Sequence, residues 1–489
     1  MKTMYAYRQI FTQSQQHRSF RYHCRYCKAS ALRFVARIKC RIYRICRNYR
    51  IAFCSGLFVS ACFLPSAGFV VSASDTNHHG LSVPKKVSFY ELAVHTLDYH
   101  PAVQSQTFKL ESSTQNVAAA KQAFWPTPSV SVERALERNR NGDLRGDATT
   151  TVLGIQQPLY TGGRLSAQLS RAEAEVQFTA AELADIEQSL LLRLIQAWSE
   201  WFVAEQKLDA VATSRETHIR LLDMVSRRSN EGVSAVADVA LAESRIGMLD
   251  AELLLLRAQQ QSALEQLSSL VGVNISQVPL SREITLPEFT QPLEYLINLA
   301  EERTPSVLMA RSQAEIAATE INLAKSQLSP EVYVRFEHQK GSFNLPGGRT
   351  NNAVYVGISS SFGPGLSSFS RVSGAAANFS AAEQDIATQL RAVAEQVRLN
   401  SALLAAANIR LKSLATAKRA SADVLASYER QFLAGRKQWL DLMNAAREQA
   451  QTATQIADAR GAMHSSALKL TLFTMGAEAF VNAAEGTYE

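Results

Sequence analysis

The sequence predicts a mainly α-helical fold with a membrane β-barrel portion, in which one unit of helices and strands occurs twice. Three observations support this prediction. Two segments, residues 164–230 and 366–432, have the length and the apolar periodicity of very long helices. A pair of short segments with alternating apolar and polar residues precedes each of them. The order of these elements repeats along the chain at a nearly constant offset.

The first long segment contains neither proline nor glycine between residues 164 and 230. Its apolar residues recur every three or four positions, as at Leu190 and Leu194, which places them on one helical face. At 1.5 Å per residue, such a helix is roughly 100 Å long. The second segment keeps the same spacing, for example at Ile386 and Leu390. Two matched rods of this length indicate a protein that spans a distance.

The order of elements indicates an internal duplication. Corresponding residues lie 204 or 203 positions apart: Pro101 and Pro305, Pro126 and Pro330, Gly232 and Gly435, Asp238 and Asp441. We therefore assign residues 88–290 to a first repeat, 291–475 to a second repeat and 476–489 to a C-terminal tail. Each repeat is expected to contain two helices, two strands, the long helix, a glycine turn and a returning helix.

Two strands are expected in each repeat, at about residues 127–134 and 150–160 and at about 331–338 and 353–362. Their alternation gives each strand one apolar and one polar face, the pattern of a sheet between lipid and water. Known membrane barrels need at least about eight strands, so four strands cannot close one. Three copies of the chain would supply twelve strands. An ordinary sheet packed on helices remains the alternative at this point.

The N-terminal part of the chain differs sharply from the rest. Residues 1–50 contain thirteen Lys and Arg and no Asp or Glu, and the remaining 38 basic and 44 acidic residues leave a net charge of −6. We read residues 1–73 as an export signal cleaved after Ala73, and residues 74–87 as a linker. Lipidation at Cys62 and an uncleaved membrane anchor are the alternatives. The acidic body excludes nucleic acid as a general partner.

The residues favour no enzymatic or cofactor chemistry. All six cysteines lie between Cys24 and Cys62, and Cys24 and Cys27 form only half of a zinc-site spacing. The nine histidines show no ligand spacing, and there is no phosphate loop or nucleophile elbow. A coiled-coil scaffold in the periplasm, without a membrane part, is a competing hypothesis. It leaves the paired amphipathic strands unexplained.

Three motifs resemble those of the TolC-type outer-membrane export channels. One is the Pro-Leu-Tyr-Thr-Gly-Gly sequence at residues 158–163, between a strand and a long helix. The other two are the glycine turns at residues 230–239 and 432–442. The resemblance covers roughly residues 88–475, with the order and the duplication of the family. Residues 361–365, Ser-Phe-Gly-Pro-Gly, depart from the first motif in the second repeat.

The resemblance implies a homotrimer in the outer membrane of a Gram-negative bacterium. Its twelve-stranded barrel would meet outer-membrane lipid and continue as a helical tunnel through the periplasm. The implied partners are a periplasmic adaptor and an inner-membrane ABC transporter or another pump. The cargo is either a protein, as in type I secretion, or a small molecule, as in multidrug efflux. Residues 432–441 look more like the adhesin-secretion branch, which favours type I secretion.

The resemblance also implies a gate near the two glycine turns. By position, Asp238 and Lys437 would bond each other in the closed state, and Asp441 would line the pore. Phe432 and Asn444 stand where the family usually has a tyrosine and a second pore acid. The implied adaptor-binding tips contain Gly232, Val233, Gly435 and Arg436. Favourable interaction of Asp238 and Asp441 with a helix N-terminus is an alternative explanation for these two acids.

Overall fold

The computed structural model describes residues 86–135, 147–287, 289–343 and 347–482. The expected export signal with Ala73 and Cys62, all six cysteines and nearly all of the linker lie outside these ranges. The elements, in order, are α2 Phe89–Tyr99, α3 Pro101–Gln122, β1 Thr127–Arg134, β2 Thr149–Tyr160, α4 Arg164–Asn230, α5 Val236–Val271, α6 Leu293–Arg303, α7 Pro305–Ser326, β3 Glu331–Lys340, β4 Thr350–Ser359, the 3-10 turn η1 Pro364–Leu366, α8 Ser367–Leu433, α9 Trp439–Met475 and α10 Ala477–Asn482. The duplicated unit is therefore present, and both long helices have 67 residues.

Proline and glycine set the same helix boundaries in both repeats. Pro101 and Pro305 each occupy the first turn of a helix, where the missing N–H costs no hydrogen bond. Gly163 precedes α4 with a φ of 85°, a backbone conformation that side-chain-bearing residues rarely adopt. The sequence located both long helices to within one residue, because such local signals mark where helices begin.

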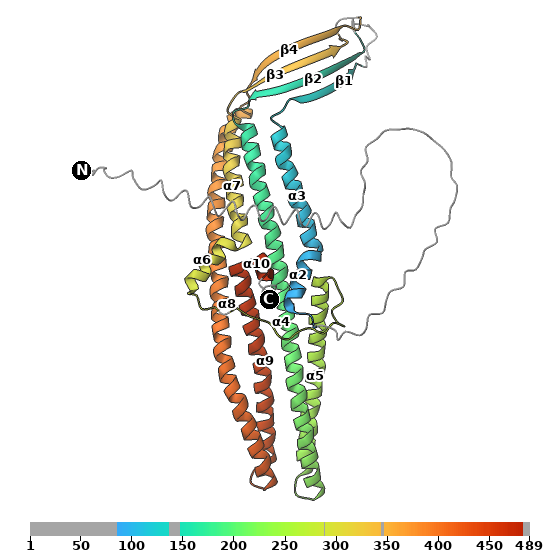
Figure 1. Cartoon of the computed structure of the whole chain (residues 1–489), viewed down its shortest axis with the longest axis vertical. Coiled ribbons are helices and arrows are strands. Elements are labelled where there is room, and N and C mark those ends of the chain that lie inside the picture. The colour runs from blue at the N-terminus through green and yellow to red at the C-terminus, as the bar shows by residue number, and fades with distance from the viewer. Residues whose placement is uncertain (1–85, 136–146, 288, 344–346, 483–489) are drawn as a thin grey trace, which may run out of the picture. The chain divides into compact units, whose positions relative to one another are not determined.

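The helices form a layer in which each long helix is flanked by shorter ones (Figure 1). The helix α3 packs along one half of α4 and α5 along the other half, while α7 and α9 divide α8 in the same way. The two repeats join because α4 also contacts α7 and α9. No helix in the described part of the chain combines the length and the apolar character needed to cross a membrane.

The main apolar core lies where the shorter helices meet, near the middle of α4. The ring of Trp198 is fully buried there, with its centroid 5.5 Å from that of Phe89. Phe480 of α10 is also fully buried, 6.1 Å from Phe89. The segment expected to be a C-terminal tail thus begins with a packed helix. The sequence did not reveal this because its apolar partners come from α2 and α4.

The four strands form one antiparallel sheet in the order β1-β2-β3-β4. Its register places apolar side chains on one face, including the pairs Val130–Leu153 and Phe336–Val354. The other face is polar, and the guanidinium carbon of Arg335 lies 5.2 Å from the centre of the Tyr355 ring there. The predicted alternation is confirmed.

The last strand is displaced from its expected position at residues 353–362. It spans Thr350–Ser359, so residues 360–362 lie outside it. The ladder with β3 ends at the pair Glu331–Ser359. Residue 330 is a proline, which has no N–H to extend the ladder, and this explains the earlier end.

The loops that follow β1 and β3 are joined through one carboxylate. Asp147 accepts hydrogen bonds from the backbone N–H of Ser342 at 3.2 Å and of Gly348 at 3.1 Å. Its own N–H donates to the Ser342 carbonyl oxygen at 2.7 Å. The two repeats are therefore connected at the loop end of the sheet as well as along the helices.

Candidate functional site

The two glycine turns close the hairpins α4–α5 and α8–α9 by the same local geometry. Gly232 and Gly435 have φ angles of 74° and 71°. After each glycine, a backbone N–H bonds back to the preceding helix, from Val233 to the Arg228 carbonyl and from Arg436 to the Gln431 carbonyl, both at 2.8 Å. We call residues 231–235 the first tip and residues 434–438 the second tip. Val233 and Arg436 are exposed there.

The two hairpins contact each other just behind the tips. A separate apolar cluster joins them, formed by Leu221, Val225, Ala242, Leu425, Phe432, Trp439, Leu442, Met443, Ala445 and Ala446. Phe432 is only 5% exposed, and its ring centroid lies 5.3 Å from that of Trp439. Phe432, which stands where the family usually has a tyrosine, is therefore part of an apolar contact.

A side chain that the sequence did not single out also links the hairpins. The Arg228 guanidinium of α4 lies over the Phe432 ring, 4.9 Å from its centroid. Its Nη1 donates a hydrogen bond to the Leu433 carbonyl oxygen at 3.3 Å, at the C-terminus of α8. Its Nε is buried and has no hydrogen-bond partner among the described residues. Arginine is common in the last turn of a helix, so nothing local distinguished Arg228 from Arg227.

Lys437 makes its contacts within its own hairpin. Its Nζ lies 3.5 Å from Asp441 Oδ2 and 4.3 Å from the centre of the Tyr428 ring. Burial acts to lower the pKa of Lys437, but the charges of Asp441 and Tyr428 and the hydrogen bonds to both side chains together outweigh burial, so the pKa is raised. The structure thus pairs Lys437 with Asp441, whereas the resemblance implied a bond to Asp238. Asp238 lies half-buried in the first turn of α5.

Asp441 begins a polar face on α9. Asn444 and Glu448 follow it at helical spacing, and both are exposed. Further along the same helix, Asp458 Oδ1 forms an ion pair with Lys207 Nζ of α4 at 2.7 Å. Asp458 therefore lies where α9 meets the neighbouring long helix.

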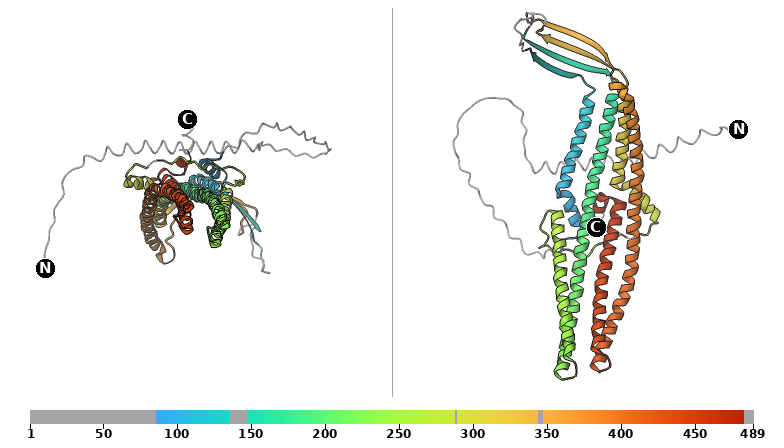
Figure 2. Two further views of the ribbon diagram at one scale, coloured as in Figure 1. Left: turned by 90° about the horizontal axis from the view of Figure 1, so that it is seen from below. Right: turned by 180° about the vertical axis from the view of Figure 1, so that it is seen from behind.

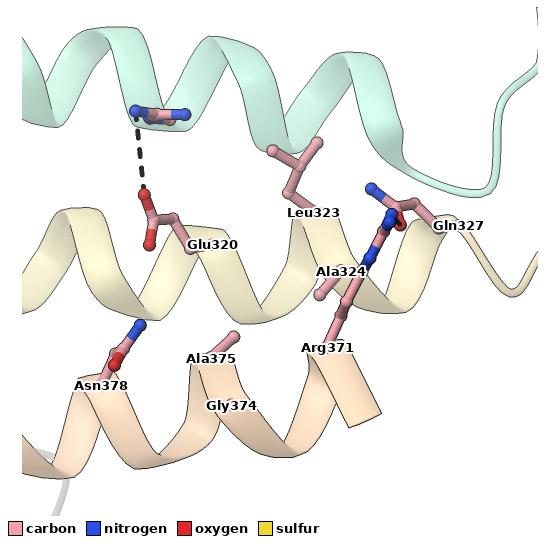
Figure 3. Close-up of a pocket in the computed structure, with 9 residues that line it drawn as sticks. Glu320, Leu323, Ala324, Gln327, Arg371, Gly374, Ala375 and Asn378 are labelled. Carbon is pink, nitrogen blue, oxygen red and sulfur yellow. Dashed lines mark hydrogen bonds and ion pairs between the residues drawn. The ribbon is translucent and has the colours of Figure 1, made fainter. Parts of the chain in front are cut away.

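Two shallow grooves lie on the helical wall. The first, of about 340 Å³, is formed by α4, α7 and α8 near the sheet (Figure 3). Arg171 is paired there with Glu175 at 3.1 Å and with Glu320 at 3.7 Å, and Arg371 donates to the Gln327 side-chain oxygen at 3.2 Å. The second groove, of about 290 Å³, lies between α4, α8 and α9. Within the described ranges, no group of three or more His, Cys, Asp or Glu side chains could hold a metal ion.

Comparison with known proteins places the chain among outer-membrane channels. A model of the family described as outer membrane efflux protein matches residues 92–273 and 296–474. The outer membrane protein TolC of Vibrio cholerae is 22% identical over 361 residues, covering 71% of this chain and 81% of that protein. The alkaline protease secretion protein AprF of Pseudomonas aeruginosa is 22% identical, covering 73% and 77%. The cobalt-zinc-cadmium resistance protein CzcC of Cupriavidus metallidurans is 23% identical, covering 62% and 72%.

Solved structures share the fold. The outer membrane protein VceC of Vibrio cholerae has a TM-score of 0.70 at 17% identity, with 79% of this chain and 96% of that chain covered. The CmeC outer membrane channel of Campylobacter jejuni has a TM-score of 0.68 at 12% identity, with 82% and 88% covered. The arrangement of sheet and helices described above is therefore one that known outer-membrane channels have.

Proposed function

The chain belongs to the outer membrane efflux protein family, and on this premise we propose that it forms the exit channel of an export system spanning the cell envelope. Three copies would close one twelve-stranded barrel in the outer membrane, and their helices would continue as a tunnel in the periplasm. The channel is a non-enzymatic conduit, so its function consists of gating and conduction.

The open sheet is the observation that carries this proposal. Within the described sheet, β1 and β4 each have a neighbouring strand on one side only. Large apolar side chains on one face are widely exposed, among them Val130 at 71%, Val356 at 73% and Ile358 at 73%. In lipid, unpaired backbone groups at a sheet edge have no water to bond. Pairing of β4 with β1 of the next copy would satisfy both edges, and lipid would cover the apolar face.

We propose that the hairpin tips form the gate and the adaptor contact. Gly232, Val233, Gly435 and Arg436 would meet the periplasmic adaptor at the two exposed tips. Asp238, Lys437, Asp441, Asn444 and Phe432 would belong to the gate. To this set we add Arg228, because its contacts with Phe432 and Leu433 hold one hairpin against the other.

For the cargo, we propose a protein exported by type I secretion, with an inner-membrane ABC transporter as the pump. The sequence of residues 432–441 and the likeness to AprF, a secretion protein, support this assignment. Efflux of small molecules is the second candidate, supported by the likeness to the resistance protein CzcC. Both candidates use the same trimer and the same type of partner.

Purification from the outer-membrane fraction tests the channel. We expect a heat-modifiable trimer that conducts ions across a planar lipid bilayer. A stable water-soluble monomer would contradict the proposal and favour the periplasmic scaffold. Deletion of the gene in its natural host separates the cargoes: loss of a large secreted protein supports type I secretion, whereas sensitivity to toxic small molecules with unchanged secretion supports efflux.

A further inference from the structure

The second groove lies near the middle of the helical wall, where α9 reaches its upper end. Its lining residues are Leu192, Arg193 and Gln196 of α4, Gln396 of α8, and Lys469 and Phe473 of α9. The polar members come from three helices, and Leu192 and Phe473 supply apolar surface. The groove therefore combines two cationic groups, two amides and an apolar floor.

The groove faces away from the helices that cover the wall. On α4, Leu194 and Trp198 are buried in the core that contains α2 and α10. Arg193 and Gln196 are exposed, and helical spacing puts them on the opposite side of α4. Seen along the helices, the wall is an arch with α2 and α10 on its convex side (Figure 2). The groove thus opens on the concave side, which becomes the tunnel interior in the proposed trimer.

Among the described residues, the two cations in the groove have no carboxylate partner. Across the described residues, neither Arg193 nor Lys469 forms an ion pair, and no acidic residue lines the groove. The first groove differs, because Glu175 and Glu320 pair with its Arg171. Burial lowers the pKa of His100, and the nearby positive charge of Arg193 lowers it further.

The geometry points to a carboxylate-binding site on the inner wall of the tunnel, formed by Arg193 and Lys469. Guanidinium and ammonium groups donate charge-assisted hydrogen bonds to carboxylates, and Gln396 offers a further amide donor. The side chain of Gln196 already donates to Glu200 Oε1 at 2.6 Å, so this amide is engaged, and Glu200 itself does not line the groove. The bound group is the carboxylate of passing cargo, either of a small organic acid or of an acidic side chain on an exported polypeptide. This site rests on the proposed channel function.

Block of the current through the purified trimer tests the site. Citrate represents small organic acids, and an oligoglutamate peptide represents acidic polypeptides. Either Arg193→Gln or Lys469→Gln should weaken block about fivefold, the effect of one unit charge at about 4 Å in a water-like dielectric. If the variants weaken the block by citrate alone, the site is assigned to small acids. If they weaken the block by the peptide alone, it is assigned to polypeptides.

Matched variants separate charge from structure. Arg193→Lys and Lys469→Arg keep the charge and should retain block, and Arg311→Gln removes an exposed cation of α7 outside the groove. A conducting double variant with unchanged block by both probes would overturn the site but leave the channel function intact. A wild-type protein without conductance would overturn the channel function. Calorimetric titration of citrate into the detergent-solubilised protein then decides the site separately, since equal affinity of wild type and double variant would overturn it.

Discussion

Replacing Arg228 by methionine should loosen the contact between the two hairpins. Methionine keeps an unbranched apolar stem but removes the guanidinium that lies over the Phe432 ring and bonds the Leu433 carbonyl. The apolar cluster behind the tips would remain. The variant therefore isolates the contribution of one charged group to the contact between the hairpins.

The expected size follows from the two contacts. A cation over an aromatic ring contributes about 1 kcal/mol at a partly exposed site. The hydrogen bond at 3.3 Å is long, so its net contribution is also about 1 kcal/mol. Losing about 2 kcal/mol per protomer raises the ratio of separated to joined hairpins roughly thirtyfold. In the proposed channel, this change appears as a higher open probability and a higher mean conductance.

Two assays measure the effect. Planar-bilayer recording gives the open probability, and spin labels on cysteines placed at Val233 and Leu433 give the distance between the first tip and the last residue of α8, next to the second tip. The sequence contains no cysteine after Cys62, so these labels are the only thiol adducts on the body of the chain. We expect a broader and longer distance distribution in Arg228→Met than in the wild type.

The controls use neighbouring residues. Arg227 is more exposed and pairs with Asp223 on its own helix, so Arg227→Met should change neither measurement. Phe432→Leu should resemble Arg228→Met in direction, and Phe432→Tyr should retain the ring contact. If Arg228→Met matched the wild type in both open probability and tip distance, the inter-hairpin role of Arg228 would be refuted.

Three further predictions concern stability and the loops. A Cβ added at Gly461 would overlap Val203 Cγ2, so Gly461→Ala should lower the free energy of unfolding by about 1–3 kcal/mol, measured by thermal unfolding. Gly374→Ala, where a Cβ meets nothing within 4 Å, should be neutral or stabilising. Burial lowers the pKa of His464 from 6.5 to about 4, so the unfolded chain binds the proton more strongly. Unfolding free energy should thus fall by up to about 3 kcal/mol from pH 6.5 to pH 4, and a pH titration of His464→Phe should lack this decrease. Asp147→Ala removes the carboxylate that joins the two loops, and limited trypsin digestion should cut the β3–β4 loop faster; an unchanged rate would contradict that role.

Sequence periodicity was sufficient for the helices and most of the sheet. A 3.6-residue or two-residue repeat is a local property, and proline or glycine marks the ends of elements such as α4 and α7. The alternation in β1 to β4 likewise predicted which face of the sheet is apolar. The shift of β4 was missed because its end depends on the partner strand, which begins at Glu331 after a proline.

The sequence also located the two turns, but it could not assign the contacts between them. Arg228 and Leu433 are 205 residues apart, and no local pattern links them. The resemblance implied a bond between Lys437 and Asp238 in the closed state, and this stays a prediction. In the described chain, Lys437 pairs with Asp441, one helical turn away on the same hairpin. Resemblance gives the position of a residue along a motif, whereas its partner depends on how two helices are rotated against each other.

The sequence by itself determined the repeated unit, with its helices, its strands and one glycine turn per repeat, and it also revealed the resemblance to a known family. These follow from short-range spacing, which survives in any sequence that forms the same elements. Only the tertiary structure decided that Phe480 of α10 packs against Phe89, that Arg228 joins the hairpins, and that Arg193 and Lys469 share a groove that no acid among the described residues lines. Such contacts form between helices that are far apart in the chain. They depend on how side-chain shapes and charges pack together, and sequence periodicity does not contain that information.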